Sequence, residues 1–97
     1  MPLKTPFAYI VSYDLKQAES YYTPLYQELQ RSDKWCHYLP ALWIVLRKDA
    51  LVELRPKLTS LIFQGDALLI MPAKGPADGW MTKEAWDWIN ANVPKEW

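Results

Sequence analysis

Net charge is what this chain most clearly lacks. Its 97 residues carry 11 Lys and Arg against 11 Asp and Glu, so the formal net charge is +0. Affinity for a polyanion comes largely from Lys and Arg that displace condensed counterions, and a neutral chain has no long-range field that draws DNA or RNA toward it. Only a local basic patch could bind nucleic acid, and near-zero charge gives little protection against self-association.

Cysteine and histidine are scarce, with one residue of each, Cys36 and His37. A single cysteine excludes an intramolecular disulfide, and we expect Cys36 to be a small buried hydrophobe. Zinc sites use more ligands than these two at regular spacing. Because neighbouring residues of a strand point to opposite faces, Cys36 and His37 are not expected to form a metal site or a nucleophile–base pair.

Long apolar runs are absent too. No segment approaches the roughly 20 apolar residues that span a bilayer, so no membrane partner is expected. Residues Met1 to Pro6 show no signal-peptide pattern. The sequence therefore predicts a cytoplasmic location.

Apolar and aromatic residues, in contrast, are plentiful. Hydrophobic residues make up 51% of the chain, and there are six Trp and six Tyr. This apolar content can offset chain entropy, and the length fits one domain spanning residues 1–97. Since one small core holds only a few large rings, some should lie at a subunit interface.

Hydrophobic periodicity predicts the first half of the domain. Residues 7–13 are apolar on both faces, as in a central strand. A helix should begin at Thr23 as N-cap, with Pro24 in the first helical position, and end near 31–32. Its inner face repeats at helical spacing through Tyr22, Leu25, Tyr26 and Leu29. Runs 35–39 and 42–47, joined by Pro40 and Ala41, indicate a hairpin or one broken strand.

The second half predicts another helix, a strand and a final helix. Asp49 is the expected N-cap of the second helix, and Pro56 should kink it or end a short first segment near Arg55. The inner face of that helix comprises Leu51, Leu54, Leu58, Leu61 and Ile62. A buried strand is expected at 67–71. Thr82 should then cap a C-terminal helix whose inner side carries Trp86, Ile89 and Val93.

The order of these elements predicts an α+β fold. Two split βαβ units would give a ferredoxin-like βαββαβ sandwich, with an antiparallel sheet and helices on one face. This core would span residues 7–72. Residues 73–97 would add a loop and a Trp-rich C-terminal helix.

Asp14 is the candidate catalytic and metal-binding residue, because it stands where the first strand ends. In a two-fold dimer joined across this edge, two facing Asp14 carboxylates would suit Mg²⁺, which prefers oxygen ligands. Such an ion could activate water for phosphodiester cleavage, with Ser12 as a supporting hydroxyl. The alternative is that Asp14 only caps the following loop.

A family resemblance supports this interpretation. The strand ending in Tyr13-Asp14, the hairpin around His37-Tyr38 and 43–45, and the closing strand at 66–70 carry it. They resemble the CRISPR-associated ferredoxin-like nucleases that form the smaller subunit of the spacer-adaptation complex, and their VapD toxin relatives. The resemblance covers roughly 7–72 and implies a homodimer with metal-dependent nuclease activity, in which Asp14 binds the metal.

The chain also departs from that family. The family is usually more basic, and only Lys16 follows Asp14 where several Arg and Lys are expected. The Trp-rich end is not a feature of the family core. A stand-alone relative, such as a toxin of a toxin–antitoxin pair, therefore fits better than a subunit of the adaptation complex.

A few basic and aromatic residues suggest binding surfaces. The candidates for phosphate contacts are Lys16, Arg31, Lys34, Arg47 and Lys48. Trp35 or Trp43 would serve as a stacking platform for RNA or DNA bases. The alternative is that these cations are ordinary solvated positions, since acidic residues are interleaved with them.

The Trp-rich tail has two interpretations as well. Trp80, Trp88 and Trp97 could anchor a subunit or protein interface, or could simply pack within the domain. Two functions remain open at this point. One is a metal-dependent nuclease or nuclease-derived toxin. The other is a catalytically silent homodimeric module that binds a protein or nucleic-acid partner through its sheet edge and tail.

Overall fold

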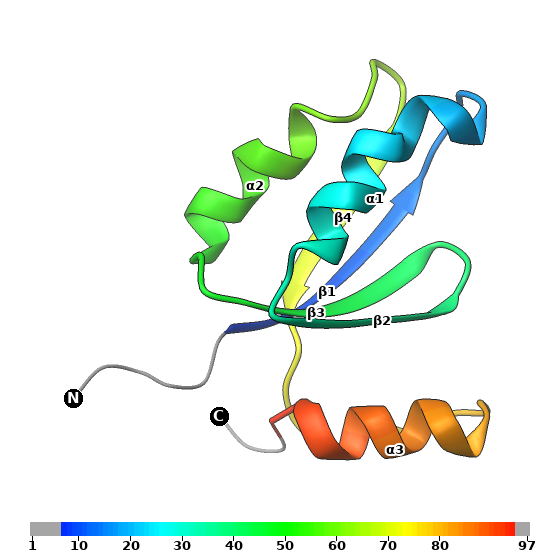
Figure 1. Cartoon of the computed structure of the whole chain (residues 1–97), viewed down its shortest axis with the longest axis vertical. Coiled ribbons are helices and arrows are strands. Elements are labelled where there is room, and N and C mark those ends of the chain that lie inside the picture. Colours follow the sequence, from blue (N-terminus) through cyan, green and yellow to red (C-terminus); the bar gives the residue numbers. More distant parts are fainter. Residues whose placement is uncertain (1–6, 95–97) are drawn as a thin grey trace.

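The computed structural model describes residues 7–94. These residues form a βαββαβ arrangement followed by one more helix, as the sequence predicts (Figure 1). The elements are β1 (Phe7–Asp14), the 3₁₀ helix η1 (Glu19–Tyr22), α1 (Thr23–Gln30), β2 (Lys34–Leu39), β3 (Leu42–Arg47), α2 (Leu51–Thr59), β4 (Ala67–Pro72) and α3 (Lys83–Asn92).

The four strands form one sheet in the order β2-β3-β1-β4. Every neighbouring pair is antiparallel, which confirms the α+β class and the antiparallel sheet. β1 is central, as its apolar residues on both faces predict. Pro40 and Ala41 form the turn between β2 and β3, where the missing N–H of Pro40 removes no ladder hydrogen bond. The topology is compatible with the ferredoxin-like arrangement.

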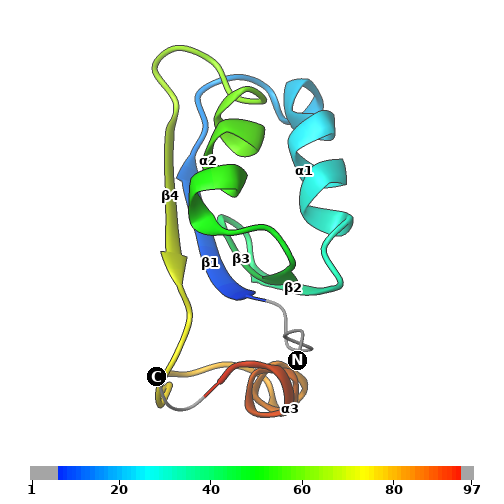
Figure 2. The same ribbon diagram turned by 90° about the vertical axis from the view of Figure 1, so that its left-hand side faces the viewer.

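The main core lies between the sheet and the helices α1 and α2, which cover the same face (Figure 2). Alternate strand residues and the inner helical positions supply it. Its buried members are Tyr9, Val11, Tyr22, Leu25, Leu29, Trp43, Val45, Leu54 and Leu58. Each fully buried Leu of this set contributes about 1.5–3 kcal/mol of transfer free energy. The predicted inner face of α1 is therefore confirmed.

The opposite face of the sheet is only partly covered. A small second cluster of Ala8, Leu46 and Ala73 packs there with Val93, which follows α3. Figure 1 shows α3 beneath the β2–β3 hairpin, on the other side of the sheet from α1 and α2. Thr82 Oγ1 accepts a hydrogen bond from the Ala85 amide at 3.2 Å, so the predicted cap of α3 is confirmed.

Both other predicted caps are wrong. The 3₁₀ turn η1 leads directly into α1, so Thr23 is already helical and its hydroxyl donates to the Ser20 carbonyl at 3.2 Å. Asp49 lies one residue before the N-cap of α2, which is Ala50. The Asp49 carboxylate is bound to Arg47 and Lys57 instead, because two cationic donors attract a carboxylate more strongly than a neutral backbone amide does.

α2 and β4 also differ in detail from the predictions. α2 continues from Leu51 through Pro56 to Thr59 without a separate first segment, and Leu51 is exposed rather than on the inner face. β4 is an edge strand, and only the face that carries Leu68 and Ile70 is covered by the core. Leu69 on its open face is 54% exposed, which makes the prediction of a buried strand wrong.

Candidate functional site at the end of the central strand

Asp14 is the last residue of β1 and pairs with Ala67 of β4. Strand alternation places Asp14 and Ser12 on the sheet face opposite α1 and α2. The Asp14 side chain is 69% exposed, and its Oδ2 lies 2.9 Å from Lys16 Nζ. The predicted position of a carboxylate at the end of a rigid central strand is therefore found.

The loop after Asp14 is fixed by Asp66. The Lys16 amide donates to Asp66 Oδ1 at 2.8 Å, while the Phe63 amide and the Tyr22 hydroxyl each donate to Oδ2 at 2.8 Å. Burial alone would raise the pKa of Asp66, but these donors outweigh it and lower the pKa. Asp66 thus joins the β1–η1 loop to the α2–β4 loop and holds the Lys16 backbone two residues after Asp14.

A single chain supplies few ligands for a cation at this position. A shallow hollow of about 260 Å³ lies beside Asp14, where Ser12 offers a hydroxyl and Ala67 and Leu69 complete the wall. Within residues 7–94 no three His, Cys, Asp or Glu residues gather closely enough to hold a metal ion. Mg²⁺ commonly uses one or two carboxylates and keeps several waters. Asp14 supplies one such carboxylate in each chain, and a second copy would add its own Asp14 as the other.

Lys16 competes with a metal for this carboxylate. The hydrogen bond from its ammonium group to Asp14 raises the pKa of Lys16, so the group stays charged at neutral pH. An exposed ion pair of this kind adds little to stability, because water screens the attraction between the two charges. A divalent cation with two carboxylate ligands would therefore displace Lys16 at little cost.

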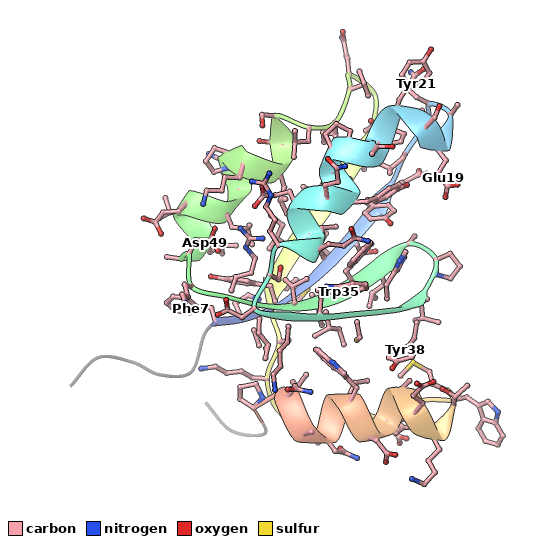
Figure 3. All side chains as sticks on the ribbon, viewed as in Figure 1. Phe7, Glu19, Tyr21, Trp35, Tyr38 and Asp49 are labelled. Carbon is pink, nitrogen blue, oxygen red and sulfur yellow. The ribbon has the colours of Figure 1, made fainter. Side chains whose placement is uncertain are left out.

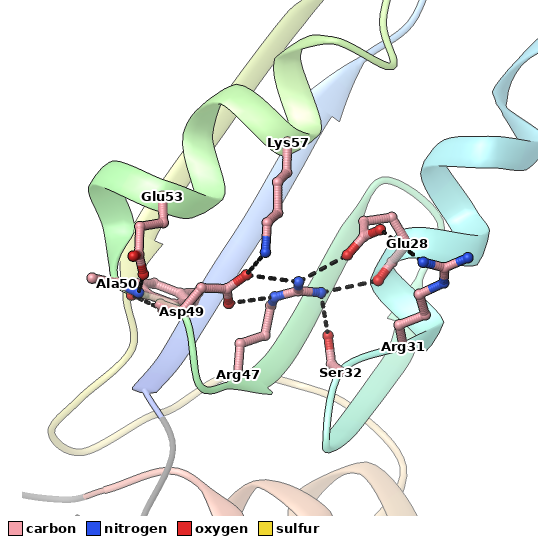
Figure 4. A network of polar contacts seen from close by, with 9 residues as sticks. Glu28, Arg31, Ser32, Arg47, Asp49, Ala50, Glu53 and Lys57 are labelled. Atoms are coloured by element: carbon pink, nitrogen blue, oxygen red, sulfur yellow. Dashed lines mark hydrogen bonds and ion pairs between the residues drawn. The ribbon is translucent and has the colours of Figure 1, made fainter.

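Arg47 does not belong to an exposed phosphate-binding surface. Its side chain is 7% exposed, and Figure 4 shows it between α1 and the start of α2. It donates to both carboxylate oxygens of Asp49 at 2.8 and 2.9 Å, to Glu28 Oε2 at 2.8 Å and to the Ser32 hydroxyl at 3.2 Å. The same guanidinium reaches the Glu28 carbonyl at 3.0 Å. This residue is a structural cation, which corrects the sequence-based grouping.

The other predicted cations are exposed but lie in separate places. Arg31 and Lys48 line one hollow of about 400 Å³ near the Arg47 network, together with Lys57. Lys16 lies beyond the opposite end of β1, because Arg47 pairs with Phe7 at the beginning of that strand. Lys34 begins the edge strand β2. Phosphate binding by these four residues stays a prediction.

The tryptophans of the tail have different environments. Trp80 is 99% exposed in the segment before α3, whereas Trp88 is half-buried on α3. Trp97 lies outside the described residues. Of the tail tryptophans within residues 7–94, only Trp80 is fully exposed, and its role as an interface anchor stays a prediction.

Cys36 and His37 lie on opposite faces of β2, as strand geometry predicts. Cys36 is buried, and desolvation raises the pKa of its thiol to about 11, so the thiol stays protonated and unreactive. His37 is exposed and stacks on Trp43 with ring centroids 4.0 Å apart. Cys36 is therefore the small buried hydrophobe that was predicted.

Sequence reasoning missed one concave surface, the groove between α1 and the hairpin. It is lined by aromatic rings from β1, α1, β2 and β3. The sequence pattern that could have predicted this groove is the spacing of Trp35 and His37 on β2. Residues two apart in a strand share a face, so both lie on the helix side of the sheet, beside Trp43 of the paired strand β3. Sequence analysis treated Trp35 and Trp43 only as alternative stacking platforms.

Comparisons with protein-family models, with curated proteins and with solved structures found no match. Among residues 7–94, no helix has the length and apolar character needed to cross a membrane.

Proposed function

We propose that this chain is a homodimeric ferredoxin-like domain that cleaves phosphodiester bonds with the Asp14 residues of two copies. The observation that carries the proposal is the position of Asp14, which is exposed at the end of the central strand on the open face of the sheet. The sheet order and the Tyr13-Asp14 strand end support a relation to the CRISPR-associated nucleases and VapD toxins that the sequence resembles.

The surface around Asp14 suits a second copy of the chain. Leu69 and Met71 of β4 are exposed on this face, and Ile10 and Ile44 of the neighbouring strands are only half-buried. Contiguous exposed apolar residues commonly mark an interaction site. In a two-fold pair, any residue near the axis meets its own symmetry mate. An axis close to the end of β1 would bring the two Asp14 carboxylates together.

The residues of this site have distinct roles in the proposed reaction. The two Asp14 carboxylates hold a divalent cation, whose chemistry when bound is the activation of water toward a phosphodiester. Lys16, once released from Asp14, carries a charged ammonium group beside the site and contacts a phosphate oxygen. Asp66 keeps the Lys16 backbone in place, so that only the side chain moves.

An activity assay with a matched control tests the proposal. Wild type, Asp14→Asn and Asp87→Asn are incubated with labelled RNA and DNA in Mg²⁺, Mn²⁺ or EDTA. Asp87 is an exposed acidic residue of α3 that pairs with Lys83, so its change repeats the same charge loss away from the site. We expect cleavage by wild type and Asp87→Asn that EDTA abolishes, and at least a 100-fold loss in Asp14→Asn. Equal cleavage by Asp14→Asn would exclude the proposed site.

A second candidate is a catalytically silent homodimeric module that binds a protein or nucleic-acid partner. It is favoured by the Lys16–Asp14 ion pair, which neutralises the one carboxylate that each chain contributes. The exposed Trp80 and the open edge of β4 would then provide the contacts. A dimer without cleavage in any metal would support this function over the first.

A further inference from the structure

A groove of about 560 Å³ lies on the helix side of the β2–β3 hairpin, along α1 from Thr23 to Gln30. Five rings line it, from Tyr13, Tyr26, Trp35, His37 and Trp43. A hollow of this size, lined by aromatic rings with a few polar groups, is typical of small-molecule sites. Figure 3 shows Trp35 over the hairpin and Glu19 on the η1 turn, both on the side of α1 that faces the hairpin.

The rings are arranged around Trp43, which is buried. His37 stacks on it at 4.0 Å with an interplanar angle of 15°, and Tyr26 stacks at 6.3 Å and 16°. Trp35 is tilted by 43° at a centroid distance of 5.2 Å and is 39% exposed. Trp43 therefore forms the base of the groove, while Trp35 and His37 present exposed ring surface to a ligand.

Hydrogen bonds hold this arrangement in place. The Trp43 indole Nε1 donates to the Tyr13 hydroxyl at 2.9 Å, and that hydroxyl donates to the Pro40 carbonyl at 3.2 Å. His37 Nε2 lies 2.8 Å from the same carbonyl. Because the rings are already fixed in the free protein, a ligand would lose little affinity to ordering them.

Glu19 gives the groove its charge. It is the only Asp, Glu, Lys or Arg in the lining, and among residues 7–94 no cation forms an ion pair with it. Burial raises the pKa of Tyr26, and the neighbouring Tyr13 and then Glu19 add to this increase. Burial also raises the pKa of Tyr13 against its hydrogen bonds with Trp43 and Tyr26, with a small contribution from Glu19. A negative rim beside electron-rich ring faces favours a positively charged guest.

We infer that this groove binds a flat organic cation, which stacks on Trp35 and His37 with its positive charge toward Glu19. A nucleotide fits less well, because no Lys or Arg lines the groove to receive a phosphate and the Glu19 carboxylate would repel it. The inference does not rest on the proposed nuclease function, since neither Trp35 nor Glu19 takes part in that reaction. Asp14 is outside the groove lining, although it lines a neighbouring hollow of about 320 Å³ together with Tyr13, Glu19 and Tyr26.

Three related probes test the inference on the full chain by NMR titration of the tryptophan indole signals. They are 1-methylnicotinamide, which is a flat cation, nicotinamide, which is its neutral counterpart, and AMP, which is a flat anion. We expect 1-methylnicotinamide to bind at least fivefold more tightly than nicotinamide, with the largest shifts at the indoles of the groove. Equal affinity for the two, tighter binding of AMP, or no binding of 1-methylnicotinamide would overturn the inference.

Two variants and one control locate the site. Glu19→Gln should remove the preference for the cation, and Trp35→Leu should weaken its binding at least fivefold. Glu84→Gln makes the same change on α3, outside the groove, and should bind as wild type does. Amide spectra report whether each variant keeps the fold. If a folded Glu19→Gln keeps the full cation preference, the groove is not the site and the inference fails.

Discussion

Arg47 is a buried cation whose partners bear directly on stability. A buried guanidinium is tolerated only when its charge and donors are satisfied, and here two carboxylates, a hydroxyl and a carbonyl satisfy them. Glu28 comes from α1 and Asp49 from the segment before α2. The cation therefore connects both helices to the end of β3, and the loss of one partner leaves a buried charge without full compensation.

Asp49→Asn should lower the free energy of unfolding by about 2–3 kcal/mol at neutral pH, because Glu28 alone would then balance the buried Arg47. Urea denaturation measures the change. The control is again Asp87→Asn, whose exposed pair with Lys83 should be worth no more than about 0.5 kcal/mol. If the two substitutions lowered the free energy of unfolding equally, the burial of Arg47 would not be the reason for the loss of stability in Asp49→Asn.

Acid should reveal the same interaction. The hydrogen bond from Arg47 lowers the pKa of Asp49, burial opposes this, and the Lys57 hydrogen bond adds to the lowering. A depressed pKa stabilises the fold above the ordinary carboxyl pKa of about 4, and that stability is lost as the pH falls toward the depressed value. Between pH 4 and pH 2 the unfolding free energy of wild type should fall more steeply than that of Asp49→Asn. Parallel curves for the two would contradict this.

At the scale of elements, α2 carries a defect that α1 lacks. Pro56 lies inside α2, where it has no N–H to donate to the carbonyl four residues earlier. Pro24 lies in the first turn of α1, where that N–H would have no helical partner in any case. The same residue type therefore has opposite consequences in the two helices.

Pro56→Ala should raise the free energy of unfolding by about 1–2 kcal/mol. The restored helical hydrogen bond outweighs the greater freedom that Ala gives the unfolded chain. Pro24→Ala is the matched control and should leave stability unchanged or slightly lower it. Thermal unfolding followed by circular dichroism distinguishes the two, and a loss of stability in Pro56→Ala would mean that the packing of α2 requires the proline.

At the scale of the whole molecule, the two faces of the sheet are covered unequally. α1 and α2 cover one face, while α3 covers only part of the other (Figure 1). The chain also has no net charge to keep copies apart. Both features favour association through the open part of the sheet around Leu69.

Wild type should be a dimer at micromolar concentration, and Leu69→Lys should weaken the dimer at least 10-fold, because pairing would bury an unpaired ammonium group. Sedimentation equilibrium measures the dissociation constant. Val52→Lys on α2 adds the same charge at a position that is already exposed, and should have no effect. A monomeric wild type would remove both the interface and the paired Asp14 site.

Much of the secondary structure is predicted by patterns among residues that are close together in the chain. The apolar runs at 7–13 and 42–47, the helical spacing of Leu25 and Leu29, and the Thr82 cap all depend on residues within a few positions of one another, so their patterns are visible along the chain. The position of Asp14 at the end of the central strand followed from the same kind of pattern. Local propensity and periodicity are enough for such features.

The pairing of polar residues, in contrast, depends on contacts between distant parts of the chain. Glu28 and Arg47 are 19 positions apart and Tyr22 and Asp66 are 44 apart, and nothing in the sequence between them records these pairings. In the folded chain Arg47 is buried, and Asp49 pairs with it instead of capping α2. The aromatic groove likewise combines residues of four separate elements. These contacts depend on how the helices pack on the sheet, which is a property of the whole chain in three dimensions.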